Sequence, residues 1–226
     1  MYPVQYEADY VEKRSRLTSL FRMFTAIPAM VLTFFYVLAA EVVVFLAWFA
    51  LLFTGRYPEG MYNFVAGAVR NVSRLQAYYV LLTDKYPPWN GEDDSAYPVR
   101  IHIAPPKQKY SRVKVFFRGI LLIPVYIIQY VYNIMMNVGS FCAWVVIVIT
   151  GKQPEGLQNF INMSMRYHVD ALAYQFLLTE DFPPITVDSR PAPIPAAPSA
   201  GAVGTGNQVS APETPTYQPP SSPDQQ

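Results

Sequence analysis

The stretch "FTAIPAMVLTFFYVLAAEVVVFLAWFALLFTGRYPEG", residues 24–60, decides the fold. Its first 30 residues, 24–53, contain a single charged side chain, Glu41. A helix needs only about 20 apolar residues to span a bilayer, whereas the helices of soluble proteins keep a polar face. A second run, residues 119–149, has no charged residue at all. The sequence therefore predicts an all-α integral membrane protein.

Composition narrows the class of protein further. Of 226 residues, 52% are hydrophobic, and the formal net charge is only +1. A nucleic-acid-binding surface needs a concentrated basic excess, so we expect no nucleic-acid partner. Cys142 is the single cysteine, which excludes an internal disulfide. It lies in an apolar run and is interpreted as a small packing residue.

The heptapeptide "TGRYPEG" of residues 54–60 returns as "TGKQPEG" at residues 150–156. A shift of 96 positions aligns residues 15–88 with 111–184 without a gap, and 26 of the 74 pairs are identical. The chain is therefore a tandem duplication. Each pseudo-repeat consists of a basic segment, a hydrophobic helix, a polar turn and an amphipathic helix. We call the basic segment of each repeat, residues 13–22 and 109–118, its lead-in. The predicted domains are a first membrane repeat (1–89), a linker (90–108), a second membrane repeat (109–186) and a tail (187–226).

These residues resemble a known family. The segments "FRMFTAIP" and "AWFALLFTGRYPEGMYNFVAGAVRNVSRLQAYYVLLTDKYPPW" are similar to the hallmark stretch of a bacterial membrane-protein family catalogued as domain of unknown function 4389. The second repeat departs from it with Lys152-Gln153 in place of Arg56-Tyr57. Together the two copies cover about residues 15–185. The resemblance implies a membrane protein and no assigned catalytic residues.

The repeated heptapeptide has the composition of a turn between helices. A glycine can close a helix in the left-handed conformation, and a proline suits the first turn of the next helix. A glutamate that follows lies at the positive end of that helix dipole. The same residues occur in both copies: Gly55, Pro58, Glu59, Gly60, Gly151, Pro154, Glu155 and Gly156. A second reading, in which Glu59 and Glu155 act as acids or cation ligands, stays open.

The second helix of each repeat, residues 60–82 and 156–178, is amphipathic at 100° per residue. Its polar positions suggest a polar intramembrane stripe made of Glu41, Arg70, Arg74, Asn137, Arg166 and Asp170. In one arrangement the helix spans the bilayer and Glu41 pairs with Arg70 or Arg74. In the other, the helix lies at the headgroups and the apolar run bends back near residues 39–41 and 133–140.

Charge placement predicts the topology. If each repeat is a spanning hairpin, twelve basic residues fall on one side and only Arg56 and Lys152 on the other. The positive-inside tendency then puts both termini in the cytoplasm of a multi-pass plasma-membrane protein. The basic lead-ins are expected to contact anionic lipid headgroups. The residues predicted for this contact are Arg14, Arg16, Arg22, Arg112, Lys114 and Arg118.

Two segments outside the helices have distinct compositions. Tyr-Pro-Val opens both "YPVQYEADY" at residue 2 and "YPVRIHI" at residue 97, and each stretch is a candidate short strand. The tail of residues 187–226 is rich in Pro, Ala, Gly and Ser, and its composition predicts disorder.

No grouping typical of an active site occurs in the sequence. His102 and His168 lie in different repeats without a second ligand nearby, so no metal or cofactor is expected. The leading hypothesis is a non-enzymatic membrane protein that binds lipids, other membrane proteins or a second copy of itself. The alternative is a small oligomeric transporter or channel in which the polar stripe lines a path.

Overall fold

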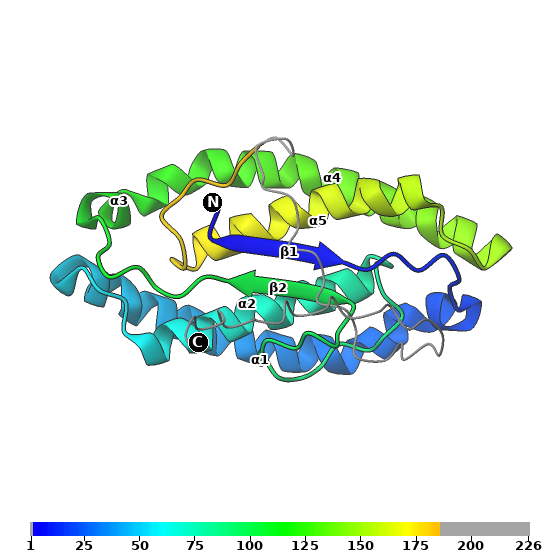
Figure 1. Cartoon of the computed structure of the whole chain (residues 1–226), viewed down its shortest axis with the longest axis horizontal. Helices are drawn as coiled ribbons and strands as arrows, with labels where there is room; N and C mark the ends of the chain where they lie inside the picture. Colours follow the sequence, from blue (N-terminus) through cyan, green and yellow to red (C-terminus); the bar gives the residue numbers. More distant parts are fainter. Residues whose placement is uncertain (1, 186–226) are drawn as a thin grey trace, which may run out of the picture. The chain divides into compact units, whose positions relative to one another are not determined.

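A computed structural model describes residues 2–185 of the chain, and the predicted disordered tail lies outside them. The fold is mostly helical, with two similar halves. Its elements follow in the order β1 (Val4–Ala8), α1 (Arg16–Thr54), α2 (Glu59–Tyr79), β2 (Val99–Ile103), α3 (Arg112–Phe116), α4 (Arg118–Thr150) and α5 (Glu155–Gln175). Figure 1 shows the strands running along the helices.

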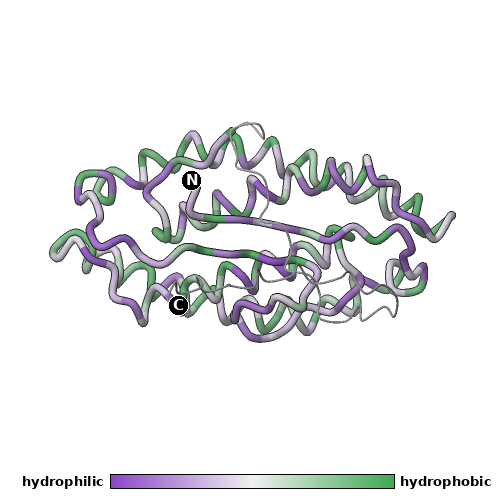
Figure 2. Tube along the Cα trace, viewed as in Figure 1, coloured by the Kyte–Doolittle hydropathy of each residue, from purple (hydrophilic) through white to green (hydrophobic). Residues whose placement is uncertain are grey.

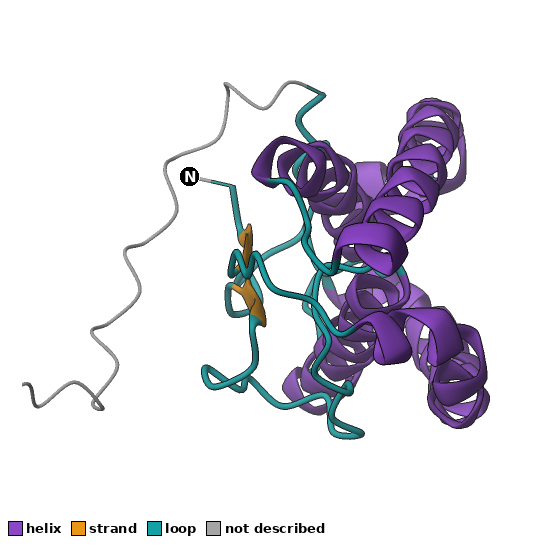
Figure 3. Cartoon of the chain, turned by 90° about the vertical axis from the view of Figure 1, so that its right-hand side faces the viewer, coloured by secondary structure: helices purple, strands orange, loops and turns teal. Residues whose placement is uncertain are grey.

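The two strands confirm the expectation from the shared Tyr-Pro-Val. β1 and β2 pair antiparallel, with Tyr6 opposite Ile101. The Tyr6 hydroxyl donates a hydrogen bond to Asn162 Oδ1 of α5 (3.2 Å), and Arg70 Nε of α2 donates to the Ile101 carbonyl (3.3 Å). The strands therefore lie on α2 and α5, and Figure 3 shows them on one side of the helices.

Each heptapeptide reverses the chain between two helices. Gly55 and Gly151 follow the long helices with φ of 70° and 75°, the left-handed conformation that costs glycine least. Within the turn, the Thr54 hydroxyl accepts a hydrogen bond from the Arg56 amide, and Thr150 and Lys152 repeat this bond at the same 3.1 Å. Pro58 and Pro154 are the N-caps of α2 and α5.

The two repeats pack antiparallel to each other. The Tyr110 amide donates to the Gly55 carbonyl (2.9 Å), and the Arg14 amide donates to the Gly151 carbonyl (3.0 Å). Trp48 Nε1 likewise donates to the Val115 carbonyl (3.1 Å), as Trp144 Nε1 does to the Ser19 carbonyl (3.2 Å). The lead-in of each repeat thus lies beside the turn of the other. The spanning-hairpin topology predicts both lead-ins at one end and both turns at the other, and these hydrogen bonds contradict that prediction.

The long helices are continuous. α1 passes without a break through residues 39–41, and α4 through residues 133–140. The alternative with an apolar run that bends back on itself is therefore wrong for both repeats. A reversal of the chain would interrupt the backbone hydrogen bonds of the helix at these residues, and both helices continue through them.

Small residues set the closest approaches in the core. Ala40 and Ala47 of α1 are fully buried, as is Ala143, the counterpart of Ala47 in α4. In the linker, a Cβ added to Gly91 would lie 2.3 Å from the carbonyl oxygen of Gly67 in α2. The linker backbone therefore rests directly on α2 at a point where neither partner has a side chain.

This contact makes Gly91→Ala a destabilising change. The added methyl group overlaps Gly67 backbone atoms, and we expect a loss of about 1–3 kcal/mol in the free energy of unfolding, typical of overpacking. Gly119→Ala in α4 is the control, because nothing lies within 4 Å of its added Cβ. Thermal unfolding in detergent, followed by circular dichroism, should rank Gly91→Ala well below the wild type and Gly119→Ala. Equal midpoints would contradict the contact.

Candidate functional site

The most prominent surface is an apolar face on α1 and α4. Large hydrophobic side chains are exposed along both helices, from Leu17 to Phe53 and from Ile120 to Ile149. Soluble monomers rarely expose a contiguous apolar patch above a few hundred Å². We call this set the apolar face; its α1 members include Phe24, Ile27, Phe34, Phe35, Leu38, Phe45 and Phe53, and its α4 members include Ile123, Ile127, Val131, Ile134, Val138, Phe141 and Ile149.

Length and hydropathy indicate membrane association. Among the described residues, α1 and α4 are both long and apolar enough to cross a bilayer. Only 17% of the most apolar window of α1 and 22% of that of α4 is buried, whereas a core helix of a soluble protein would be mostly buried. Figure 2 shows apolar positions continuing along both helices.

Exposed basic side chains gather at both ends of the helix pair. One end carries Lys13 and Arg16 from the first lead-in and Lys152 from the second turn. The opposite end carries Arg56 from the first turn together with exposed residues of the second lead-in; these are Lys109, Arg112 and Lys114. Glu12 forms an ion pair with Lys152 at 2.8 Å. This distribution follows from the antiparallel repeats.

Two lead-in arginines lie in the interior and close the ends of the amphipathic helices. Arg22 donates hydrogen bonds to the carbonyls of Tyr78 and Thr83 (2.8 Å for Thr83) and pairs with Asp84. Arg118 repeats the two carbonyl contacts in the second repeat, where it donates to Tyr174 and Thr179 (2.6 Å for Thr179). Both guanidinium groups also lie over a tyrosine ring, Tyr78 and Tyr174 respectively. We call each grouping an arginine clamp.

Arg14 is also buried, and it contacts the other repeat. Its guanidinium donates to Gln153 Oε1 (3.0 Å), to the Leu82 carbonyl (2.8 Å) and to Gln158 Oε1 (3.2 Å). For Arg14, Arg22 and Arg118 an interior position therefore replaces the expected headgroup contact, because their donors already bind protein oxygens. Arg16, Arg112 and Lys114 are exposed.

The sequence analysis did not predict two acidic residues that accept hydrogen bonds from backbone amides of the lead-ins. Asp84 Oδ2 accepts from the Ser15 amide at 3.0 Å, and Glu180 accepts from the Ser111 amide in the second repeat. Both acids follow the segment Leu-Leu-Thr, which is identical in the two repeats. That identity was the available signal, since a segment retained in both copies outside the helices points to a shared contact.

The predicted polar stripe is not assembled into one site. Arg70 faces the linker and strands, where it donates to the carbonyls of Ile101 and Gly91 (both 3.3 Å). Glu41 and Asn137 are exposed on α1 and α4, and the Asn137 amide donates to the Asn133 carbonyl at 2.8 Å. Glu41 is therefore not the partner of Arg70 within the described residues.

Arg74 and Asp170, which occupy equivalent positions in the two repeats, are both buried. The guanidinium of Arg74 lies 5.6 Å from the centroid of the Tyr97 ring, and it has no hydrogen-bond partner among residues 2–185. Burial lowers the pKa of Arg74. Its surroundings belong to the contact between α2 and the linker, and they do not form a path along the helices.

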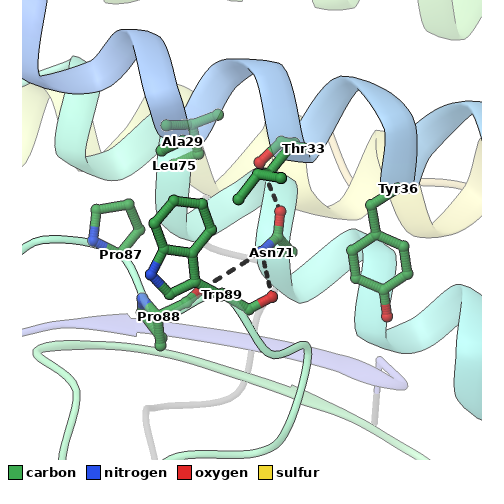
Figure 4. Close-up of a pocket in the computed structure, with 9 residues that line it drawn as sticks. Ala29, Thr33, Tyr36, Asn71, Leu75, Pro87, Pro88 and Trp89 are labelled. Atoms are coloured by element: carbon green, nitrogen blue, oxygen red, sulfur yellow. Dashed lines mark hydrogen bonds between the residues drawn. The ribbon is translucent and has the colours of Figure 1, made fainter.

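Asn71 joins α1, α2 and the linker at a cavity of about 260 Å³. Its amide donates to the Pro88 (3.4 Å) and Trp89 (3.3 Å) carbonyls, and the Thr33 hydroxyl donates to its Oδ1 at 2.7 Å (Figure 4). The hydrogen-bonding capacity of Asn71 is thus used to hold the Pro-Pro segment on the helices. Within residues 2–185, no cluster of three or more His, Cys, Asp and Glu side chains could hold a metal ion.

Comparison with known proteins identifies the family. The model for a domain of unknown function (DUF4389) matches the chain twice, at residues 16–90 and 112–186. The chain belongs to this family. Its two copies are the two repeats, each running from a lead-in through a clamp to the residues after the Pro-Pro pair. No curated protein and no solved structure matches the chain.

Proposed function

We propose that this DUF4389 protein is a non-enzymatic membrane protein that docks its apolar face into a lipid bilayer and serves there as a structural or interaction component. The observation that carries the proposal is the exposure of large apolar side chains along the whole of α1 and α4. Burial of apolar surface stabilises by about 25 cal/mol per Å². Lipid tails, or the apolar surface of another membrane protein, would supply that burial.

We further propose that the protein lies flat on one leaflet, with α1 and α4 in the membrane plane. The 39 residues of α1 make a helix of about 58 Å, roughly twice the hydrocarbon thickness of about 30 Å. Basic residues at both ends of the helix pair favour one anionic leaflet, since both ends then reach the same headgroups.

The strand pair supports the same orientation. It runs along the helices and carries Arg100, which pairs with Glu7 (3.3 Å) and Asp9 (2.8 Å). If α1 and α4 crossed the bilayer, these charges would lie near its middle, at a cost of several kcal/mol. In the flat orientation the strands face water. We therefore propose this flat orientation in place of the four-helix spanning topology. The first strand stays on the cytoplasmic side, and the basic residues at the two helix ends contact the anionic lipids of that leaflet.

Single cysteines at the two turns test the orientation. Arg56→Cys and Lys152→Cys, each in a Cys142→Ser chain, place exposed thiols at opposite ends of the helix pair. In sealed membrane vesicles of known sidedness, an impermeant maleimide should label both positions from the cytoplasmic face and neither from the other. A bundle that crosses the bilayer would be labelled at one turn from each face, and that result would overturn the flat orientation.

The transporter alternative gains no support from this arrangement. Glu41 and Asn137 lie exposed on the outer helices, whereas Arg70 contacts the linker and the strands. Among the described residues, the hydrogen bonds of Arg70 go to the linker and the second strand, and we therefore place the docking proposal ahead of the transporter.

A further inference from the structure

We propose that the cavity beside Asn71 binds a small phenol, a single aromatic ring that carries a hydroxyl group. The cavity has a volume of about 260 Å³ and lies between α1, α2 and the linker (Figure 4). We call it the ring cavity. The proposal goes beyond the membrane docking and does not depend on it, because the ring cavity is formed by residues of the first repeat alone.

The second repeat shows which group occupies the corresponding place. A shift of 96 positions matches Tyr36 and Asn71, which line the ring cavity, with Tyr132 and Tyr167. Tyr167 is only 1% exposed. Its ring stacks on that of Tyr132, with centroids 4.7 Å apart and an interplanar angle of 19°. The first repeat has Asn71 in place of this phenol ring.

The apolar walls of the two places correspond as well. Three further residues of the ring cavity, Ala29, Leu32 and Leu75, match Val125, Ile128 and Ala171 of the second repeat. These three residues of the second repeat pack with Tyr167 in one hydrophobic cluster. The same wall positions therefore enclose a phenol ring in the second repeat and a cavity in the first.

The ring cavity is large enough for one substituted ring. Trp89 lines it where the second repeat has Ile185, and a volume of about 260 Å³ remains despite the larger indole. An engineered apolar cavity of about 150 Å³ already binds benzene. Leu32 and Trp89 are 49% and 53% exposed, so the ring cavity borders the surface and a ligand can enter it.

The side chains around the ring cavity suit an aromatic hydroxyl compound. Figure 4 shows the rings of Trp89 and Tyr36 on the two sides of Asn71, and aromatic rings are favourable partners for another ring. The Thr33 hydroxyl donates to Asn71 Oδ1 (2.7 Å), and the Tyr36 hydroxyl donates to the Phe64 carbonyl (3.3 Å). Both hydroxyl protons are thus used, and each hydroxyl oxygen keeps a lone pair that can accept. A ligand that donates an O–H group therefore fits better than a carbonyl compound, which only accepts.

Fluorine NMR of para-fluorophenol with the full chain in mild detergent tests the site. We expect the wild type to bind the probe saturably, at one site per chain. Asn71→Tyr gives the first repeat the ring that the second carries, and it should abolish saturable binding. Because the probe also dissolves in micelles, this variant in the same detergent measures the background. Tyr167→Phe is the matched control, because it keeps the ring of the other repeat, and it should bind as the wild type does.

The hydroxyl group is tested with fluorobenzene, which has the same ring without the O–H donor. We expect it to bind about fivefold more weakly than para-fluorophenol, the effect of one lost hydrogen bond. Equal affinities for the two probes would overturn the preference for a hydroxyl group.

Two results would overturn the ring site itself: no saturable binding of para-fluorophenol by the wild type, or the same binding by Asn71→Tyr. Should Asn71→Tyr not fold, Ala29→Val is the second variant, since valine is the residue that the other repeat carries at this wall position. The added methyl groups narrow the ring cavity and should weaken binding about tenfold. Unchanged affinity of Ala29→Val would then overturn the site. Membrane docking stands in each case, because it rests on the apolar face.

Discussion

Replacing Leu38 and Ile134 by aspartate should abolish bilayer binding. These residues are pseudo-equivalent, lie near the middle of α1 and α4, and are 55% and 49% exposed. An aspartate at membrane depth costs about 2.5–3.5 kcal/mol on the insertion scale, so each change should weaken partitioning roughly 100-fold. The double variant should leave most of the protein unbound in a vesicle flotation assay.

The control for this prediction adds the same charge elsewhere. Ser95→Asp places it on an exposed linker residue, and partitioning should remain as in the wild type. Circular dichroism in detergent should show the same helix content for all three proteins, since neither Leu38 nor Ile134 belongs to the buried core. If Leu38→Asp with Ile134→Asp floats as well as the wild type, the apolar face does not contact lipid.

Arg118→Leu should strongly destabilise the fold. The change removes the guanidinium donor from the buried carbonyls of Tyr174 and Thr179, and it removes the cation over the Tyr174 ring. The Leu177 amide remains as a donor to the Tyr174 carbonyl. A hydrogen bond from a charged donor contributes about 1.5–3 kcal/mol, so loss of the two should cost about 3–6 kcal/mol. For a domain of this size, that corresponds to a fall in Tm on the order of 10 °C, which differential scanning fluorimetry in detergent would detect.

The arginine clamp and the predicted headgroup contact of Arg118 lead to different expected results for Arg118→Leu. Arg112→Leu, at an exposed position in the same lead-in, should change the unfolding free energy by no more than about 0.5 kcal/mol. A headgroup role for Arg118 instead predicts normal stability in detergent and a loss seen only with anionic lipid. Wild-type stability of Arg118→Leu in neutral detergent would disprove the clamp.

Local patterns predicted the elements of this fold well. The reversal at Gly55 and Gly151 follows from glycine's tolerance of the left-handed conformation, which is a property of the residue itself. The duplication is visible as aligned identities, and the matched Tyr-Pro-Val pointed to the strand pair. These features depend on neighbours in sequence and on a spacing that can be counted.

The position of the lead-in arginines was not predictable in the same way. Arg22 and Arg16 both precede the apolar run, yet Arg22 is buried and Arg16 is exposed. The difference depends on where α2 ends, because the Arg22 guanidinium lies beside the carbonyls of Tyr78 and Thr83 and donates to both. Such a contact joins residues 56 positions apart and leaves no periodic signal.

The sequence by itself determined that the chain holds two copies of one unit, each with a lipid-compatible helix, a tight reversal and an amphipathic helix, because hydropathy and conformational preference are local properties. Only the tertiary structure decided that the copies run in opposite directions, so that each lead-in meets the other's turn and basic residues occupy both ends. Counting charges along the sequence assigns the basic residues to the two sides of the membrane only after a topology has been assumed. The relative direction of two similar units is fixed by contacts between them, such as those of Trp48 and Trp144.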